Sequence, residues 1–208
     1  MNNKDYTEFE AKFYPVNKEE YRKKLKSIGA ELVILERKMV RWVADYRDNS
    51  MLSKRECIRV RNEGGLVRLS FKSFVNDLSR VSDQKEIETE VSDFAATVKI
   101  FEKIGLKFNR NQETLREEWK YKKAQITIDT WPGLLSFIEI EGTSEVEIKQ
   151  ISSELGFDWD EKLIFPASGL YAKVYGVDED TALVEISNIS FNNPPFKGKK
   201  KIWPQKDI

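Results

Sequence analysis

The chain has 208 residues, of which 40% are hydrophobic and 34% charged, and its 35 basic residues balance its 35 acidic ones. This length suits one large domain or two small ones with an apolar core, and the balanced charge argues against general polyanion binding. The chain has no histidine, which removes the commonest zinc ligand and general base, and its one cysteine, Cys57, favours a reducing cytoplasm. No signal-peptide pattern and no membrane-spanning apolar run occur, so we expect no membrane association.

The amino-terminal segment predicts a strand followed by a helix. Glu8 and Glu10 flank an apolar residue, and side chains two apart on a strand share one face. A helix is expected over residues 17–28, because Asn17 can cap its start and Gly29 is a typical C-terminal stop. The strand therefore presents two carboxylates together, just ahead of a helix.

The next segment predicts a hairpin whose strands carry basic side chains. Arg59 and Arg61 alternate with apolar residues, and a turn is expected at residues 62–65. Beyond the turn the alternation continues as far as Lys72. The hairpin thus gathers positive charge on one of its faces.

The order of carboxylate pair and helix then recurs twice, and its first recurrence indicates a weak internal duplication. The later pairs are Glu86 and Glu88 before a predicted helix at 93–104, and Glu139 and Glu141 before one at 144–155. Another alternating strand, between these two units, ends near Asp129. After residue 176 a short acidic helix is expected, followed by an arm rich in proline and lysine.

This pattern predicts an α+β fold in which helices cover the apolar face of an antiparallel sheet. The charged face of the sheet either meets solvent or lines a closed barrel. A solvent face is ordinary for any one strand. We favour the barrel, because carboxylate pairs recur on three strands and arginines pair on a fourth.

Residues Glu8-Phe9-Glu10-Ala11-Lys12 resemble the Glu-x-Glu-x-Lys signature of the CYTH superfamily, the triphosphate tunnel metalloenzymes. This superfamily includes class IV adenylyl cyclases, thiamine triphosphatases and inorganic triphosphatases. Similar stretches follow in the family's order at residues 57–61, 69–72, 86–88, Arg116 with Trp119, Asp129, 132–134 and 137–142. The chain departs from the family pattern at residues 45–48 and at Thr114.

The resemblance implies an eight-stranded antiparallel β-barrel with helices packed outside it, spanning residues 1–176, and a carboxy-terminal extension over residues 177–208. It also implies three sets of site residues in the bore. The metal ligands would be Glu8, Glu10, Asp129, Glu139 and Glu141; the substrate-binding residues Lys12, Arg59, Arg61, Lys72 and Arg116; and the catalytic residues Glu86, Glu88 and Lys12. Carboxylates without histidine suit hard cations, so Mg²⁺ or Mn²⁺ is expected.

The expected function is metal-dependent hydrolysis of an inorganic or organic triphosphate. Two alternatives stay open: a class IV-like adenylyl cyclase that makes cyclic AMP and pyrophosphate from ATP, and a phosphate-binding module that sequesters nucleotides or polyphosphate. Hydrolysis is favoured because no motif reads an adenine. Trp42 and Trp119 could stack on an organic group, and a core or rim position suits them equally well. The expected partner is a small molecule that contains a triphosphate. Nucleic acid is not expected, and a homodimer stays open.

Overall fold

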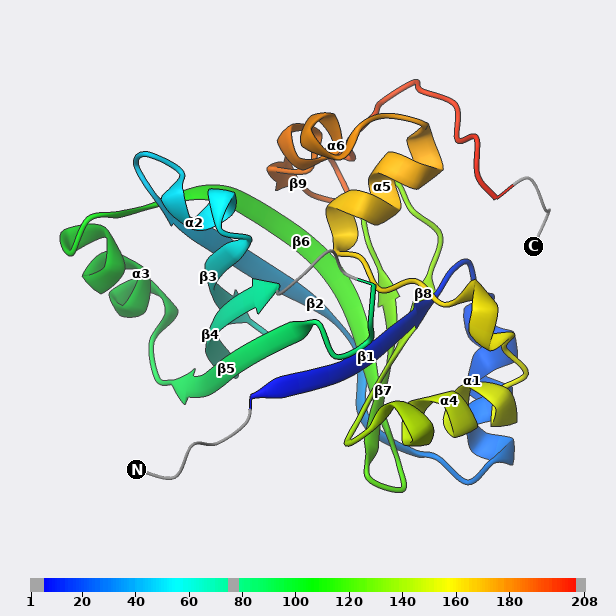
Figure 1. The fold of residues 1–208 in the computed structure, drawn as a ribbon. Coiled ribbons are helices and arrows are strands. Elements are labelled where there is room, and N and C mark those ends of the chain that lie inside the picture. The colour runs from blue at the N-terminus through cyan, green and yellow to red at the C-terminus, as the bar shows by residue number, and fades with distance from the viewer. Residues whose placement is uncertain (1–5, 75–78, 205–208) are drawn as a thin grey trace.

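The computed structural model describes residues 6–74 and 79–204, which form an α+β fold around one closed ring of strands (Figure 1). The strands are β1 (Thr7–Phe13), β2 (Glu31–Tyr46), β3 (Glu56–Asn62), β4 (Val67–Phe74), β5 (Gln84–Val91), β6 (Leu106–Tyr121), β7 (Ala124–Thr130), β8 (Phe137–Gly142) and β9 (Asn188–Ile189). The helices are α1 (Lys18–Ser27), α2 (Ser50–Ser53), α3 (Phe94–Lys103), α4 (Glu145–Glu154), α5 (Ala167–Tyr175) and α6 (Glu179–Glu185), with a 3₁₀ turn η1 (Trp159–Glu161).

The ring closes because the two longest strands pair with each other. The sheet order is β2-β3-β4-β5-β1-β8-β7-β6, and β2 then pairs antiparallel with β6 from Glu31 opposite Lys120 to Tyr46 opposite Leu106. The closure is uneven, since β1 and β5 share only the registered pairs Thr7 with Lys85 and Glu8 with Gln84. The short β9 lies parallel to β6 outside the ring. The predicted α+β barrel is thus confirmed, in an irregular form.

Local capping places the predicted helices where the sequence indicates. Asn17 accepts hydrogen bonds from the backbone amides of Glu19 and Glu20 at the start of α1. Asp93 and Ser144 cap α3 and α4 in the same manner. Each side-chain oxygen satisfies an amide that the first turn of a helix leaves unpaired. These helices confirm the boundaries expected from the sequence.

The apolar faces of the strands point outward and are covered by the helices. One cluster joins β1, β7 and β8 to α1 and α4 through buried residues such as Leu25, Ile126, Ile140 and Ile148. Removing these side chains from water supplies the main driving force for folding. Because a strand alternates its side chains, burying one face outside the ring turns the charged face inward.

The carboxy-terminal segment packs against α5. Phe196 stacks on Tyr175 with ring centroids 4.4 Å apart, and Trp203 stacks on Tyr14 at 5.4 Å. Phe196 belongs to a second apolar cluster that also contains Tyr171 of α5 and Ala182 of α6, and Trp203 packs on that cluster. The expected domain boundary after residue 176 lies within this cluster and stays a prediction. None of the helices in the described part of the chain has the length and apolarity needed to span a bilayer.

Candidate active site

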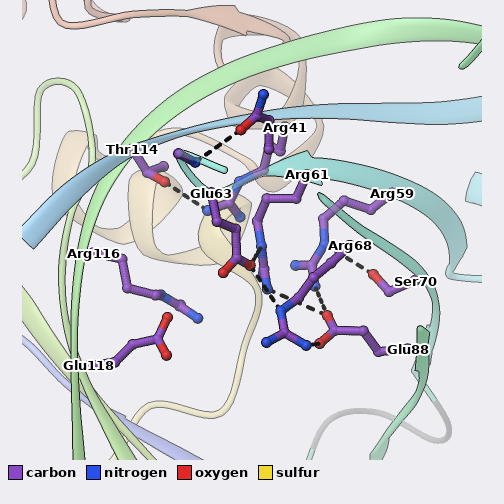
Figure 2. A network of polar contacts seen from close by, with 12 residues as sticks. Arg41, Arg59, Arg61, Glu63, Arg68, Ser70, Glu88, Thr114, Arg116 and Glu118 are labelled. Atoms are coloured by element: carbon purple, nitrogen blue, oxygen red, sulfur yellow. Dashed lines mark hydrogen bonds and ion pairs between the residues drawn. The ribbon is translucent and has the colours of Figure 1, made fainter. Parts of the chain in front are cut away.

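A cavity of about 1050 Å³ runs through the ring, and many charged side chains line it together with apolar ones. These side chains come from the inward faces of the strands, where the sequence places the carboxylate and arginine pairs. Figure 2 shows the arginine side of this lining, with side chains from β2, β3, β4 and β6 converging on one space. The charged face therefore lines a tunnel.

The two signs of charge are segregated around the tunnel. The consecutive strands β5, β1 and β8 carry the acidic lining, namely Glu86, Glu88, Glu8, Glu10, Glu139 and Glu141. The consecutive strands β6, β2, β3 and β4 carry the basic lining, namely Arg110, Arg116, Arg41, Arg59, Arg61, Arg68 and Lys72. Three charged strand residues break this pattern. Lys12 lies on the acidic side, and Glu56 and Glu118 lie on the basic side. We call the two sides the acidic wall and the basic wall.

On the acidic wall, Lys12 lies among carboxylates. It is 6% exposed, its ammonium is bonded to Glu10, and its Nζ lies 3.6 Å from a carboxylate oxygen of Glu139. Burial would lower the pKa of Lys12, but the Glu10 and Glu139 carboxylates raise it above its usual value. Lys12 is therefore a fixed positive charge inside the tunnel.

The same wall holds more carboxylate than its cations balance. Burial raises the pKa of Glu8 to about 8; Lys72 opposes this rise, and the neighbouring Glu86 adds to it. Burial and the charge of Glu10 likewise raise the pKa of Glu141 above its usual value. Among the described residues, Glu141 has no ion-pair partner. Crowded carboxylates of this kind gain when a divalent cation joins them.

The donor set of the acidic wall fits a hard divalent cation. Cross-strand pairing sets Glu10 opposite Glu141 on β1 and β8, and Glu8 and Glu139 lie on the same two strands. All four side chains offer carboxylate oxygens, the ligands that Mg²⁺ and Mn²⁺ prefer. No three acidic side chains within residues 6–74 and 79–204 already stand at metal-binding spacing. Binding would therefore draw Glu8, Glu10 and Glu139 away from their present lysine and arginine partners.

On the basic wall, the predicted phosphate ligands are held by carboxylates. Arg59 Nη2 donates to Glu86 at 2.7 Å, and Lys72 Nζ lies 2.7 Å from the same carboxylate. Arg61 Nε donates to Glu63 at 2.6 Å. These ion pairs hold the cationic side chains in place across the tunnel.

The Glu86 carboxylate is well suited to accept hydrogen bonds. Burial would raise its pKa, but Arg59 and Lys72 hold the pKa well below its usual range. Glu88 accepts from Arg68 at 3.0 Å and from Arg61 at 3.4 Å. Both predicted catalytic glutamates are thus acceptors on the acidic wall that side chains of the basic wall anchor.

The structure brings the predicted site residues together, except Asp129, which lies behind the lining. Asp129 is 0% exposed and accepts from Arg116 Nε at 2.8 Å and Nη2 at 2.9 Å, and from the Thr127 hydroxyl at 2.6 Å. In this arrangement it orients Arg116 toward Glu139, which lies 2.6 Å from Nη2. Its role as a metal ligand stays a prediction.

Sequence reasoning missed two residues of the site, one that supports the tunnel lining and one that belongs to it. Glu63 looks like an ordinary turn residue before two glycines, yet its side chain is 1% exposed and binds three arginines, namely Arg37, Arg61 and Arg68. Arg41 is a lone charge between Met39 and Val43 on its strand face. The alternation of side chains along β2 could have indicated that Arg41 faces the same side as Met39 and Val43.

The tryptophans singled out in the sequence lie outside the cavity. Trp119 is 1% exposed in the first apolar cluster, and Trp42 packs against Phe94 and Phe108 under α3. Trp131, which follows β7, is the tryptophan that lines the tunnel. No stacking role for Trp42 or Trp119 on a tunnel ligand is supported by these positions.

A closed ring with facing acidic and basic walls defines a charged-tunnel protein. The CYTH domain family model matches residues 7–164, and the chain belongs to the CYTH family. This confirms the resemblance drawn from the Glu-x-Glu-x-Lys segment. Members of the family are in general metal-dependent enzymes that bind triphosphates.

Solved structures share the fold at low sequence identity. A candidate adenylate cyclase from Vibrio parahaemolyticus is 12% identical with a TM-score of 0.71, over 80% of this chain and 98% of that one. A conserved hypothetical protein from Pyrococcus furiosus is 19% identical with a TM-score of 0.63, over 77% and 97%. A candidate adenylyl cyclase from Hippeastrum, described as having a dominant triphosphatase activity, is 14% identical with a TM-score of 0.58, over 82% and 97%. No curated protein matches the chain.

Proposed function

We propose that this protein is a divalent-metal-dependent triphosphatase that hydrolyses inorganic triphosphate or an organic triphosphate inside the tunnel. The observation that carries the proposal is the division of the tunnel into an acidic and a basic wall. A metal–triphosphate complex presents a cation on one side and anionic oxygens on the other. It therefore complements both walls at once, which neither a free anion nor a free cation does.

The basic wall supplies the contacts for the phosphate oxygens. Arg59, Arg61 and Arg116 offer planar forks that can bond two oxygens at once, and Lys72 adds a compact charge. Arg61 and Arg116 now pair with Glu88 and Glu139, which a phosphate oxygen could replace as acceptor. Arg59 and Lys72 can keep their contacts with Glu86 and offer their remaining donors to phosphate. Substrate binding thus exchanges one set of charge-assisted hydrogen bonds for another, while the arginines stay in place.

The acidic wall would hold the metal through Glu8, Glu10, Glu139 and Glu141. When bound, a divalent cation supplies positive charge to the phosphate oxygens and lowers the pKa of a bound water. Glu86 is anchored by Arg59 and Lys72 and can accept a hydrogen bond from the attacking water, which orients that water toward phosphorus. Lys12 keeps its proton and stabilises negative charge on the leaving oxygen.

We prefer hydrolysis to cyclisation because of the residues that line the tunnel. The strand faces that form its two walls carry charged groups, and Trp42 and Trp119, which could have stacked on a base, lie outside it. Trp131 does line the tunnel, but its ring is covered by the guanidinium of Arg41. The Hippeastrum protein supports the same choice, since it is described as a candidate cyclase with a dominant triphosphatase activity. The cyclase is kept as an outcome of the test.

The test offers the purified protein inorganic triphosphate or ATP, each with Mg²⁺, with Mn²⁺ or with excess chelator, and separates the products. Inorganic triphosphate should yield pyrophosphate and phosphate with either metal and nothing in chelator, and ATP should yield no cyclic AMP. Cyclic AMP with matching pyrophosphate would establish the cyclase instead. Triphosphate binding without any product would favour the sequestering module.

A further inference from the structure

Arg41 on β2 is a buried guanidinium that forms no ion pair with any carboxylate of residues 6–74 and 79–204. The residue is 7% exposed, and its Nη2 donates to the hydroxyl of Thr114 at 3.0 Å. Its guanidinium carbon lies 4.4 Å from the ring centroid of Trp131. Its Nε is buried and has no hydrogen-bond partner, and no described aspartate or glutamate forms an ion pair with it.

The other arginines nearest to Arg41 are neutralised. Arg59, Arg61 and Arg116 donate to carboxylates at 2.7, 2.6 and 2.8 Å respectively. Burial together with the charges of these three arginines lowers the pKa of Arg41 well below its usual range, and the charge of Asp129 opposes this only in part. A buried cation without a counter-ion destabilises a fold unless something else stabilises it. A bound anion would supply that missing charge.

The guanidinium of Arg41 is held in one orientation. The ring of Trp131 covers one of its faces, so an anion has to approach in the plane of the fork, where two oxygens can be bonded together. Thr114 accepts from Nη2, whereas the enclosed Nε has no hydrogen-bond partner within the described structure. Figure 2 shows Arg41 above the group formed by Arg59, Arg61 and Arg68. Arg41 is therefore a preformed donor at the edge of the arginine group.

Arg41 also marks one end of the tunnel. Its stacking partner Trp131 packs edge-on against Tyr171 of α5, with ring centroids 6.2 Å apart. The first turn of α5, at Ala167 and Ser168, lines the same cavity. An anion held by Arg59 and Arg116 that extends toward α5 therefore meets Arg41 at its end.

We propose that Arg41 binds the end phosphate of the substrate that lies nearest α5, and that it makes the tunnel select a triphosphate over a diphosphate. The inference rests on the proposed function in taking the anion to be a phosphate chain. A diphosphate held by the central arginines leaves Arg41 unpaired, whereas a third phosphate completes its hydrogen bonds. Charge-assisted bonds of this kind contribute about ten- to a hundredfold in affinity.

The test measures equilibrium binding by calorimetry in chelator at low salt, with inorganic triphosphate and pyrophosphate as the two probes. The variants are Arg41→Met, which removes the charge, and Arg41→Lys, which keeps the charge without the fork. Lys38→Met is the matched control, since Lys38 lies on the same strand with a 58% exposed side chain paired to Glu113 on the outer face. Melting temperatures without ligand show that each variant is folded.

We expect Arg41→Met to bind triphosphate about ten- to a hundredfold more weakly and pyrophosphate nearly unchanged, with Arg41→Lys intermediate and the control like wild type. The inference is overturned if Arg41→Met binds triphosphate as tightly as wild type, or if it loses affinity equally for both probes. Triphosphate binding that depends on Arg41, combined with no phosphate release in Mg²⁺ or Mn²⁺, would support the subsite and remove the proposed hydrolysis.

Discussion

Glu63 accepts a 2.6 Å hydrogen bond from Nε of Arg61, although Glu63 lies in the turn between β3 and β4 and Arg61 lies on the tunnel wall. The same carboxylate accepts from Arg37 Nη2 at 2.7 Å, and its side chain is 1% exposed. Burial would raise its pKa, but Arg61 and Arg37 lower it below the usual value. Glu63 thus holds Arg61 by Nε and leaves the far end of the guanidinium for a ligand.

Glu63→Gln should separate this positioning role from a direct role in chemistry. The amide keeps the shape but loses the charge-assisted bonds, so KM for triphosphate should rise several-fold while kcat stays near that of wild type. The loss of a buried ion pair should also lower the free energy of unfolding by about 3 kcal/mol. Steady-state kinetics and urea denaturation measure the two effects. Glu90→Gln is the control, since the side chain of Glu90 is 64% exposed. An equal effect in the control would show that Glu63 does not position Arg61.

The stability of the protein without metal should depend on pH through Glu8. The folded state raises the pKa of Glu8 from 4.5 to about 8, so between these values the folded protein binds more protons than the unfolded chain. Stability from this group is therefore present at low pH and is lost as pH rises toward 8. Glu8→Gln should be more stable than wild type at pH 8 and should lose this advantage below pH 5. Thermal melts from pH 5 to pH 8 measure the difference in stability between the two proteins. A difference that does not change with pH would contradict the raised pKa of Glu8.

The two glutamates of β8 should behave alike in catalysis and differently in stability. Glu139→Gln and Glu141→Gln should both abolish turnover, because each removes a proposed metal ligand. Glu141 has no ion pair in the described structure, so its variant should be at least as stable as wild type. Glu139 binds Arg116 at 2.6 Å, so its variant should lose about 3 kcal/mol. Activity assays and denaturation measure both effects, and turnover by either variant would exclude that residue as a ligand.

Arg59 should require its fork as well as its charge. Its Nε donates to Ser70 at 3.1 Å and its Nη2 to Glu86 at 2.7 Å, which leaves a defined edge for phosphate. Arg59→Ala should raise KM for triphosphate strongly, and Arg59→Lys should recover only part of the loss, since an ammonium cannot bond two oxygens in one plane. Equal kinetics for the lysine variant and wild type would place Arg59 outside the phosphate site.

The positions of the main helices and the carboxylate pairs were predictable from local sequence. Capping by Asn17, Asp93 and Ser144 acts within a few residues, so the pattern carries all of the necessary information. The pairing of Glu8 with Glu10 on one face follows from the two-residue repeat of a strand. The family resemblance extended these local features to an assignment of roles.

The partners of each charged group could not be predicted in the same way. Asp129 was assigned to metal by its family position, but Arg116 engages both of its oxygens in the folded chain. Trp42 was a candidate for stacking on a ligand, but Trp131, which the sequence did not single out, is the one that lines the tunnel. Such choices depend on which strands become neighbours.

The sequence by itself determined the periodicity of charge, the ends of α1, α3 and α4, and the absence of histidine from the site. The tertiary structure decided the rest, because pairing of β2 with β6 closes the ring and turns an alternating face into two opposed walls. Only that closure removes Arg41 from water and leaves its charge unbalanced. A charge becomes a binding determinant when its neighbours and its burial are both set, and both arise from contacts between residues far apart in the chain.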